Sequence, residues 1–309
     1  MVDWDREKKI VHLLADVEKS AAPAWNRYRV QAGSGLTLSR LTTGYEREVL
    51  DFLARRPSHT FGLTGFIRDN TLVSPRNRGR FYACRDRSGI LKGVALIGHA
   101  VLYETTSDEA IEMFARLARS NSDAFLSLAE ADKSDIFCRH YSEGGFEPQV
   151  ICRKLLFEQR QADSESEPVG NLRKATLDDL EVVVKAHAEV TGDERGVDPL
   201  ETDASGFRDR CTYRIERGRT WVWTDRRRLM FKADIISATP YAYYLEGIWV
   251  NESERSKGYG LRCMSQLGRT LLQQTRAICV LADQKNEAAQ RLYEKAGYQR
   301  ISLYDTVYL

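Results

Sequence analysis

The sequence predicts a mixed α/β fold that is built twice along the chain. In the second half, apolar runs typical of strands alternate with segments of helical periodicity. A short segment of the first half recurs near the end of the second half. A polar, acidic stretch over residues 158–168, which ends in Pro168, has the composition of a linker. We therefore predict two copies of one domain, residues 1–157 and 169–309.

Each element expected in the second half depends on a local pattern. Strands are indicated by apolar or alternating runs, and helices by apolar stripes with capping residues at their ends. Tyr241–Val250 is nearly all apolar, which predicts burial on both of its faces. The expected strands are Asn171–Lys174, Arg219–Thr224, Leu229–Ile236, Tyr241–Val250, Ala277–Ala282 and Ile301–Leu309. Helices are expected after Thr176, along the stripe from Leu261 to Leu272, and from Asn286 to Gly297.

The first half repeats the end of this scheme. His140–Phe146 aligns with Leu292–Tyr298, and both the tyrosines and the glycines in these segments differ by 152 positions (293 − 141 and 297 − 145). A strand is expected before the helix, over Ala124–Ala129, and another after it, over Val150–Phe157. These matching flanks favour an internal duplication over coincidence. A leading helix is also expected, with Ile10, Val11, Leu14 and Val17 on one face.

Composition excludes several classes of protein. The 309 residues carry 46 Lys and Arg against 44 Asp and Glu, a net charge of +2, which predicts no duplex nucleic acid partner. The mean hydropathy of −0.45 and the lack of a long apolar run predict no membrane span. The acidic start is unlike a secretion signal, and six cysteines without a C-x-x-C pair favour a reducing cytoplasm. The five histidines have no metal-ligand spacing, so no metal is expected.

The segment most suggestive of a binding site is a glycine-containing turn that opens a helix. Its residues are Arg255, Ser256, Lys257, Gly258, Tyr259 and Gly260, directly after a buried strand. Glycines let a ligand approach the backbone, and free N–H groups at a helix start attract anions, so a phosphate or pyrophosphate is the expected ligand. A dinucleotide fingerprint is weakened because Cys263 occupies its third glycine position, although Asp283 mimics the ribose-binding acid. A Walker loop is excluded, and a purely structural turn stays an alternative.

The wider pattern resembles the GNAT N-acetyltransferase superfamily. The R-x-x-G-x-G turn after a buried strand is followed, in order, by a helix, a strand and the segment containing Asn286, Tyr293 and Gly297, and the match spans about Asn171 to Leu309. The resemblance implies tandem domains, each a mixed, mostly antiparallel sheet flanked by helices. It implies that Ile248, Trp249 and Val250 bind the pantetheine arm of acetyl-CoA, that residues 255–260 bind its pyrophosphate, and that Asn286 and Tyr293 reach it from the last helix.

Two residues are expected to take part in chemistry. The family motif places a tyrosine, here Tyr293, beside the thioester sulfur, where a hydrogen bond to the leaving thiolate is its expected role. Its alternative is an ordinary core aromatic. Glu246, just before the cofactor strand end, is placed to hold the acceptor ammonium and pass its proton through water. Its alternative is a structural carboxylate paired with a backbone or Arg donor.

The acceptor and the first half are less defined. The acidic stretch from Asp193 to Asp203 favours a cationic amine or, alternatively, is a solvated loop with helix-capping acids. In the first half, Asp108 and Glu109 stand where a phosphate loop would be, so this copy is expected to have lost its cofactor.

These observations together predict an acetyl-CoA-dependent N-acetyltransferase in which a small-molecule or protein amine attacks the thioester directly. The competing interpretation is a non-catalytic acyl-CoA-binding module for recognition or regulation. The sequence gives no oligomeric state.

Overall fold

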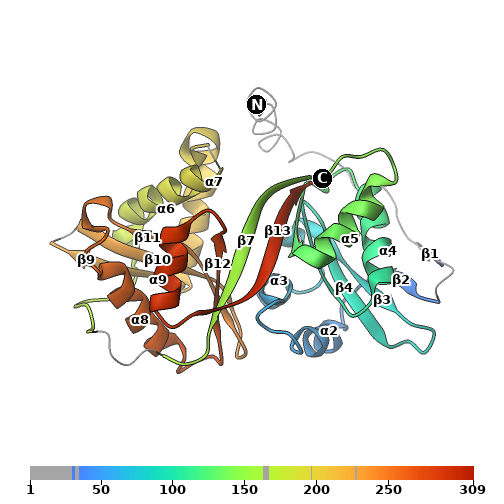
Figure 1. The fold of residues 1–309 in the computed structure, drawn as a ribbon, viewed down its shortest axis with the longest axis horizontal. Helices are drawn as coiled ribbons and strands as arrows, with labels where there is room; N and C mark the ends of the chain where they lie inside the picture. The colour runs from blue at the N-terminus through green and yellow to red at the C-terminus, as the bar shows by residue number, and fades with distance from the viewer. Residues whose placement is uncertain (1–29, 32–34, 163–166, 196, 227) are drawn as a thin grey trace. The chain divides into compact units, whose positions relative to one another are not determined.

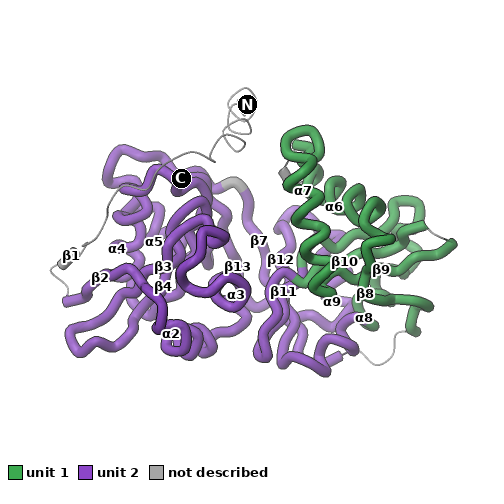
Figure 2. The backbone as a smooth tube through the Cα atoms, turned by 180° about the vertical axis from the view of Figure 1, so that it is seen from behind, with its two compact units in different colours: residues 1–26, 167–235, 246–266 green, residues 27–166, 236–245, 267–309 purple. Residues whose placement is uncertain are grey.

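The structure is a computed structural model that describes residues 30–31, 35–162, 167–195, 197–226 and 228–309 (Figure 1). It divides into two compact units (Figure 2). Of the described residues, unit 1 comprises Glu167–Ile235 and Glu246–Gln266. Unit 2 comprises the described residues up to 162 together with Ile236–Leu245 and Leu267–Leu309. The expected leading helix with Ile10, Val11, Leu14 and Val17 lies outside the described residues, and the predicted domain boundaries stay a prediction.

The first half follows the expected alternation of strands and helices. Its acidic helix start is present, because Asp108 and Glu109 begin α4. In order, the elements are β1 (Val30–Gln31), β2 (Thr37–Arg40), α2 (Glu46–Leu53), α3 (Phe61–Asn70), the 3-10 helix η1 (Pro75–Asn77), β3 (Gly79–Arg85), β4 (Leu91–Gly98), β5 (Ala100–Thr105), α4 (Asp108–Arg119), β6 (Leu126–Glu130), α5 (Ala131–Ser142) and β7 (Gln149–Gln159).

The described part of the second half contains every strand and helix that its sequence predicts, together with the α-helix α7 and the 3-10 helix η3, which it does not predict. In order, the elements are β8 (Arg173–Lys174), the 3-10 helix η2 (Leu177–Asp179), α6 (Leu180–Arg195), α7 (Pro199–Glu216), β9 (Thr220–Asp225), β10 (Arg228–Ala238), β11 (Tyr243–Val250), the 3-10 helix η3 (Glu252–Glu254), α8 (Tyr259–Leu271), β12 (Ile278–Asp283), α9 (Glu287–Lys295) and β13 (Gln299–Tyr308).

The sequence did not predict α7. Most of the acidic stretch from Asp193 to Asp203 is helical, at the end of α6 and the start of α7, so the solvated-loop interpretation is wrong for most of its length. The helix-capping part of that interpretation is confirmed at Asp198, whose carboxylate accepts a hydrogen bond from the Leu200 N–H at 2.8 Å. An acidic cap and Pro199 at the first helical position are favourable for a helix start, which explains why a helix begins here.

The two halves exchange their last strands within unit 2. Strand β13, from the end of the chain, pairs antiparallel with β6 of the first half. Strand β7, from the end of the first half, pairs antiparallel with β12 of the second half, and β7 and β13 also pair with each other. The long paired strands β7 and β13 lie side by side (Figure 1). The last strand of each half therefore completes the sheet of the other.

The sheet of the first half has a core on both faces. Ala95 and Ile97 of β4 pack with α4 and α5, whereas Val94 and Leu96 pack with α2 and α3. This alternation is what a strand buried on both faces requires, since successive side chains point to opposite faces. In unit 1, Val222 of β9 and Leu229 of β10 pack against apolar residues of α6 and α7. The predicted fold class, a mixed sheet flanked by helices in each of two tandem copies, is confirmed.

The internal repeat is also visible in backbone detail. Tyr141 of α5 and Tyr293 of α9 are both buried, with exposed fractions of 4% and 5%. Gly145 and Gly297, which follow these helices, both have left-handed φ angles, of 80° and 87°. A left-handed residue after a helix favours glycine, so the same residue types recur because the same turn recurs.

Candidate functional site

The predicted anion-binding turn lies entirely in unit 1, between β11 and α8. Asn251 fixes its beginning. The Asn251 side chain donates to the Leu229 carbonyl at 3.0 Å and accepts from the Ser253 N–H at 3.2 Å. The Glu254 N–H then donates to the Asn251 carbonyl, which closes the short helix η3. The chain that follows is thus held at a defined point beside β10.

The turn itself presents backbone to solvent. Ser256 and Gly258 have φ angles of 63° and 81°, and residues 255–258 are exposed. A Cβ placed on Gly258 would lie more than 4 Å from every atom of the part of the chain that the structure describes, so this backbone is open on that side. The first N–H groups of α8 have no acceptor within their own helix and point out of its N-terminus. An exposed helix start of this kind fits a phosphate group.

The basic side chains of the turn contact carboxylates. An Arg255 Nη lies 3.2 Å from a carboxylate oxygen of Glu189 on α6, and the Arg255 Nε donates to the Val250 carbonyl at 3.2 Å. Lys257 pairs with Glu254 at 3.1 Å. Hydrogen bonds from Lys257, and further contacts with Arg228, hold the pKa of Glu254 below its usual value. A phosphate would compete with carboxylates for these two cations, which remain half exposed at 49% and 55%.

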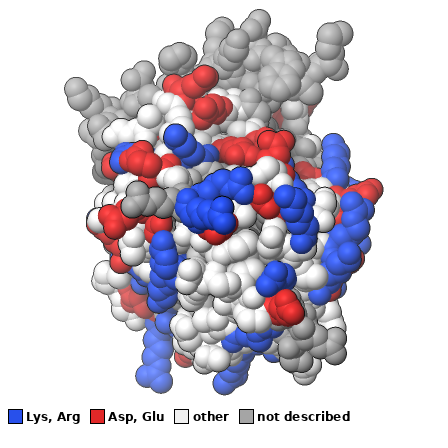
Figure 3. All heavy atoms as spheres, turned by 90° about the vertical axis from the view of Figure 1, so that its left-hand side faces the viewer, with Lys and Arg blue, Asp and Glu red and all other residues white. Residues whose placement is uncertain are grey.

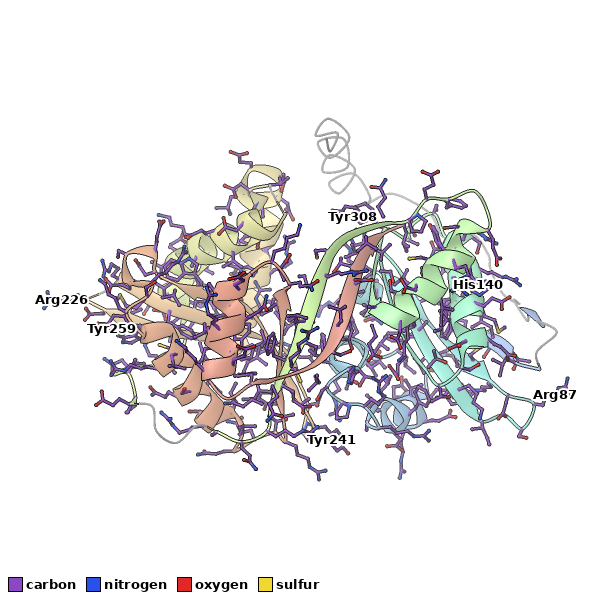
Figure 4. The ribbon with its side chains drawn as sticks, in the orientation of Figure 1. Arg87, His140, Arg226, Tyr241, Tyr259 and Tyr308 are labelled. Carbon is purple, nitrogen blue, oxygen red and sulfur yellow. The ribbon has the colours of Figure 1, made fainter. Side chains whose placement is uncertain are left out.

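Tyr259 belongs to the same turn, but its side chain packs against the sheet of unit 1. Its ring centre lies 5.0 Å from that of Trp223 on β9. Tyr259 lies on the side of unit 1 where Arg226 marks the β9–β10 turn (Figure 4). The contact with Trp223 anchors the first residue of α8 to the sheet of unit 1.

The last residues of β11 are less buried than the sequence predicts. Tyr244, Leu245 and Gly247 are buried, but Ile248, Trp249 and Val250 are only partly buried. The expectation of burial on both faces is therefore wrong for the last three residues of the strand. The indole N–H of Trp249 is buried and has no hydrogen-bond acceptor among the described residues. An unpaired buried donor is costly, so a ligand that supplied an acceptor at this strand end would be favoured.

The parallel pairing of β11 with β12 is short. Its register covers Tyr243 with Ile278, Tyr244 with Cys279, and Leu245 with Val280. Both strands continue after the last pair, β11 to Val250 and β12 to Asp283. The predicted cofactor residues Ile248, Trp249 and Val250 thus belong to the part of β11 that follows this paired register.

Glu246 is the first residue of β11 after the paired register. It is partly buried rather than enclosed, and it takes part in an interaction. A partly exposed carboxylate is less costly than the fully buried one that the apolar context predicts.

Tyr293 lies on α9, in unit 2, and Asn286 is the residue that precedes this helix. The Asn286 side chain caps the helix by accepting from the Ala289 N–H at 3.0 Å, as the sequence predicts. Tyr293 is buried against Phe157 and Tyr298, with ring centres 5.7 Å and 5.9 Å away. Burial among aromatic rings agrees with the core alternative for Tyr293.

In the first half, the strand ends that correspond to those of β11 and β12 carry different side chains. Parallel pairing of β5 with β6 covers only Ala100 with Leu126 and Val101 with Ser127, so these strands also continue past their paired register. Here the strand ends carry two carboxylates, Glu104 and Glu130. Arg56 bridges them, with an Nη 3.0 Å from Glu104 and the other 2.8 Å from Glu130.

Further donors complete this cluster. Lys133 lies 3.1 Å from Glu104 and 2.9 Å from Glu130, and the His59 Nδ1 lies 3.1 Å from Glu130. Both carboxylates are nearly buried, at 7% and 12% exposure. An ion cluster at these strand ends is unsuited to an uncharged pantetheine chain, which gives a physical reason for the predicted loss of the cofactor in this copy.

Sequence reasoning missed a buried charge pair in unit 1, Lys232 and Asp234 on β10. The signal was present, because two charges two residues apart stand in an otherwise apolar strand pattern. His187, which the sequence assigned no role, lies beside this pair, with its Nδ1 3.4 Å from the Lys232 Nζ.

Other expectations concern metals, membranes and surface charge. Among the described residues, no group of His, Cys, Asp and Glu is arranged to hold a metal ion, and all six cysteines are free thiols. No helix in the described part of the chain has the length and apolar character needed to cross a bilayer. On the face shown in Figure 3, basic and acidic side chains are interspersed.

One segment of the second half is similar to a known protein family. Residues 232–308 match the GNAT-related family described as FR47-like protein. No match was found among curated proteins.

Solved structures share the fold along most of the chain. A GCN5-related N-acetyltransferase from Sphaerobacter thermophilus is 11% identical with a TM-score of 0.58, covering 90% of this chain and 96% of its own. A GNAT-family acetyltransferase from Colwellia psychrerythraea is 12% identical with a TM-score of 0.54, covering 88% and 98%. A tandem GNAT protein from the clavulanic acid biosynthesis pathway is 11% identical with a TM-score of 0.55, covering 89% and 98%. The last quarter of the chain is therefore similar to the FR47-like family, and its fold is similar to that of a solved tandem GNAT protein along most of its length.

Proposed function

We propose that the chain is an acetyl-CoA-dependent N-acetyltransferase whose second half transfers the acetyl group to a primary amine. The observation that carries this proposal is the exposed turn at the start of α8. It combines open backbone at Gly258, left-handed φ angles at Ser256 and Gly258, and the half-exposed cations Arg255 and Lys257. These features suit a pyrophosphate, and they directly follow a strand end that is only partly buried.

The residues present fit the acyl donor. Acetyl-CoA supplies a thioester whose carbonyl carbon a free amine attacks directly. Arg255, Ser256, Lys257, Gly258, Tyr259 and Gly260 would hold the pyrophosphate, and Ile248, Trp249 and Val250 would bind the pantetheine arm. Asn286 keeps the role that the family resemblance implies, in addition to capping α9.

Glu246 would hold the acceptor ammonium. A primary alkylammonium has a pKa near 10.4 and a carboxylate near 4.3, so a direct proton transfer is uphill by about six units. Glu246 therefore orients the ammonium and passes its proton through water. The backbone N–H of Ile248 or Trp249 would polarise the thioester carbonyl.

Tyr293 would donate a hydrogen bond to the leaving sulfur. A phenol has a pKa near 10 and a thiol near 8.5, so full proton transfer from Tyr293 to the thiolate costs about 2 kcal/mol. A hydrogen bond that stabilises the developing negative charge is the more favourable role.

The test is a panel of primary amines assayed for release of the CoA thiol, together with calorimetric binding of acetyl-CoA. Arg255→Ala should weaken acetyl-CoA binding about tenfold, the loss of roughly 1.4 kcal/mol expected for one charged hydrogen bond at an exposed site. Arg116→Ala is the matched control, because Arg116 is 46% exposed and pairs with Glu112 on α4 of the first half.

The outcomes separate the candidate functions. Amine-dependent thiol release identifies the enzyme. Tight acetyl-CoA binding without release across the panel identifies the acyl-CoA-binding module instead. Equal affinities for the wild type, Arg255→Ala and Arg116→Ala would contradict the assignment of the pyrophosphate to this turn.

A further inference from the structure

A buried charge pair lies on β10, the strand next to β11 in the sheet. Lys232 and Asp234 are two residues apart on β10, so their side chains share one face of the sheet. Both side chains are fully buried, and the Lys232 Nζ donates to a carboxylate oxygen of Asp234 at 2.6 Å. Buried charges are costly and are kept where they are paired and hydrogen-bonded, so the surroundings of this pair determine what it does.

The negative charge of Asp234 is surrounded by hydrogen-bond donors and basic side chains. Thr220 of β9 donates to its other oxygen at 2.7 Å, and Arg214 and His187 lie 3.6 Å and 3.7 Å from it. Burial by itself would raise the pKa of Asp234, but the positive charges of Lys232 and Arg214 outweigh burial and hold the pKa below its usual value. The carboxylate therefore remains a fixed anchor for the Lys232 ammonium.

The same ammonium reaches the neighbouring strand. The Lys232 Nζ donates to the Gly247 carbonyl at 3.1 Å. Gly247 has a left-handed φ of 59°, which is unusual inside a strand and typical of glycine at a bulge. A Cβ at this position would lie 2.9 Å from the Lys232 Nζ, so the close approach of lysine to this backbone also requires glycine.

The peptide bond links this contact to the proposed chemistry. The carbonyl of Gly247 and the N–H of Ile248 belong to one planar trans peptide, in which they point in opposite directions. A side chain that fixes the carbonyl on the Lys232 side therefore fixes the Ile248 N–H toward the opposite side. That N–H is one of the two donors assigned above to the thioester carbonyl.

We propose that Lys232 is a positioning residue that, anchored by Asp234, holds the Gly247–Ile248 peptide so that the Ile248 N–H is aimed at the acyl group. This inference rests on the proposed function for its chemical consequence. Its structural part, a peptide held by a buried ammonium, is independent of that function. Loss of an oriented donor of this kind lowers kcat by roughly 10²- to 10³-fold in enzymes that stabilise an oxyanion.

The test compares three variants with the wild type. Lys232→Met removes the ammonium but leaves Asp234 without its closest partner, which lowers the stability of the folded state. The double variant Lys232→Met/Asp234→Asn removes both charges of the pair and separates folding from peptide orientation. Thr220→Val is the matched control, because it removes a hydrogen bond to Asp234 without touching Gly247.

Two measurements are made on each folded variant. The amide order parameter of Ile248, measured by nuclear magnetic resonance without ligand, should fall from about 0.85 in the wild type to below about 0.6 in the double variant. The double variant should also lose at least tenfold in kcat while its affinity for free CoA stays within about twofold. Thr220→Val should keep the wild-type order parameter and kcat.

The possible failures are distinguishable. An unchanged Ile248 order parameter in the double variant overturns the positioning role, whatever the activity. A lowered order parameter with wild-type kcat overturns its catalytic consequence. A wild type that releases no CoA thiol with any amine overturns the proposed function, and the order parameter then still decides whether Lys232 holds the peptide.

Discussion

Replacing Arg56 with methionine removes the cation that bridges Glu104 and Glu130 at the strand ends of the first half. Breaking a buried ion pair from one side typically costs 3–5 kcal/mol. The cost here is smaller, because Arg56 is 38% exposed and Lys133 still contacts both carboxylates. We expect Arg56→Met to lower the free energy of unfolding by about 2 kcal/mol at pH 7, which corresponds to a fall in Tm of roughly 4–8 °C.

The expected loss depends on pH. Burial by itself would raise the pKa of Glu130, but hydrogen bonds from His59, Arg56 and Lys133 outweigh burial and hold that pKa well below its usual range. Because the pKa is lower in the folded than in the unfolded state, this stabilisation is present above the unfolded pKa of about 4.3 and is lost as pH falls toward the folded pKa. The Tm difference between wild type and Arg56→Met should therefore shrink between pH 7 and pH 3.

The assay is thermal unfolding followed by calorimetry, with Arg55→Met as the control. Arg55 is the adjacent residue, is exposed, and stacks on the Phe52 ring at 5.4 Å, so its loss should cost less than about 1 kcal/mol. Adding Glu104→Gln to Arg56→Met removes one uncompensated charge and should recover part of the lost stability. Equal Tm values for Arg56→Met and Arg55→Met at pH 7 would refute the assignment of a stabilising role to the bridge.

Three further predictions concern the second half and the number of binding sites. Tyr293→Phe should lower kcat in the amine assay and leave acetyl-CoA affinity nearly unchanged, and wild-type turnover would remove its role at the sulfur. Glu246→Gln should lower kcat, with a loss that shrinks at high pH because the amine then loses its proton to solvent; a loss independent of pH would favour a structural carboxylate. Calorimetry should give one acetyl-CoA per chain, because the ion cluster occupies the strand ends of the first half, and two sites per chain would contradict that account.

Elements defined by local patterns were predictable from the sequence. The last helix is an example: Asn286 caps it, Tyr293 lies on its buried stripe, and Gly297 ends it with a left-handed φ. The turn before α8 was predictable for the same reason, since glycine spacing and a helix start are adjacent in sequence. Partial burial of Ile248–Val250 was not, because an apolar run does not show which strand neighbours are present.

Features that depend on distant partners were not predictable. β7 and β13 were each expected as strands, but their sequences do not show that each pairs with the sheet of the other half. The bridging role of Arg56 was hidden in the same way, since its partners Glu104 and Glu130 are 48 and 74 residues away.

The exchange of β7 and β13 has a consequence for any fragment that contains only one half of the chain. A fragment that ended at the linker would keep β7, whose partner β12 it lacks, and would have no β13 to cover the open edge of β6. The complementary fragment would have the reverse defect, and unpaired edges of this kind invite aggregation. Removal of either half would therefore leave the sheet of the other half without one of its strands. The half without a predicted cofactor site therefore supplies a strand, β7, to the sheet of the other half, independently of any catalytic contribution.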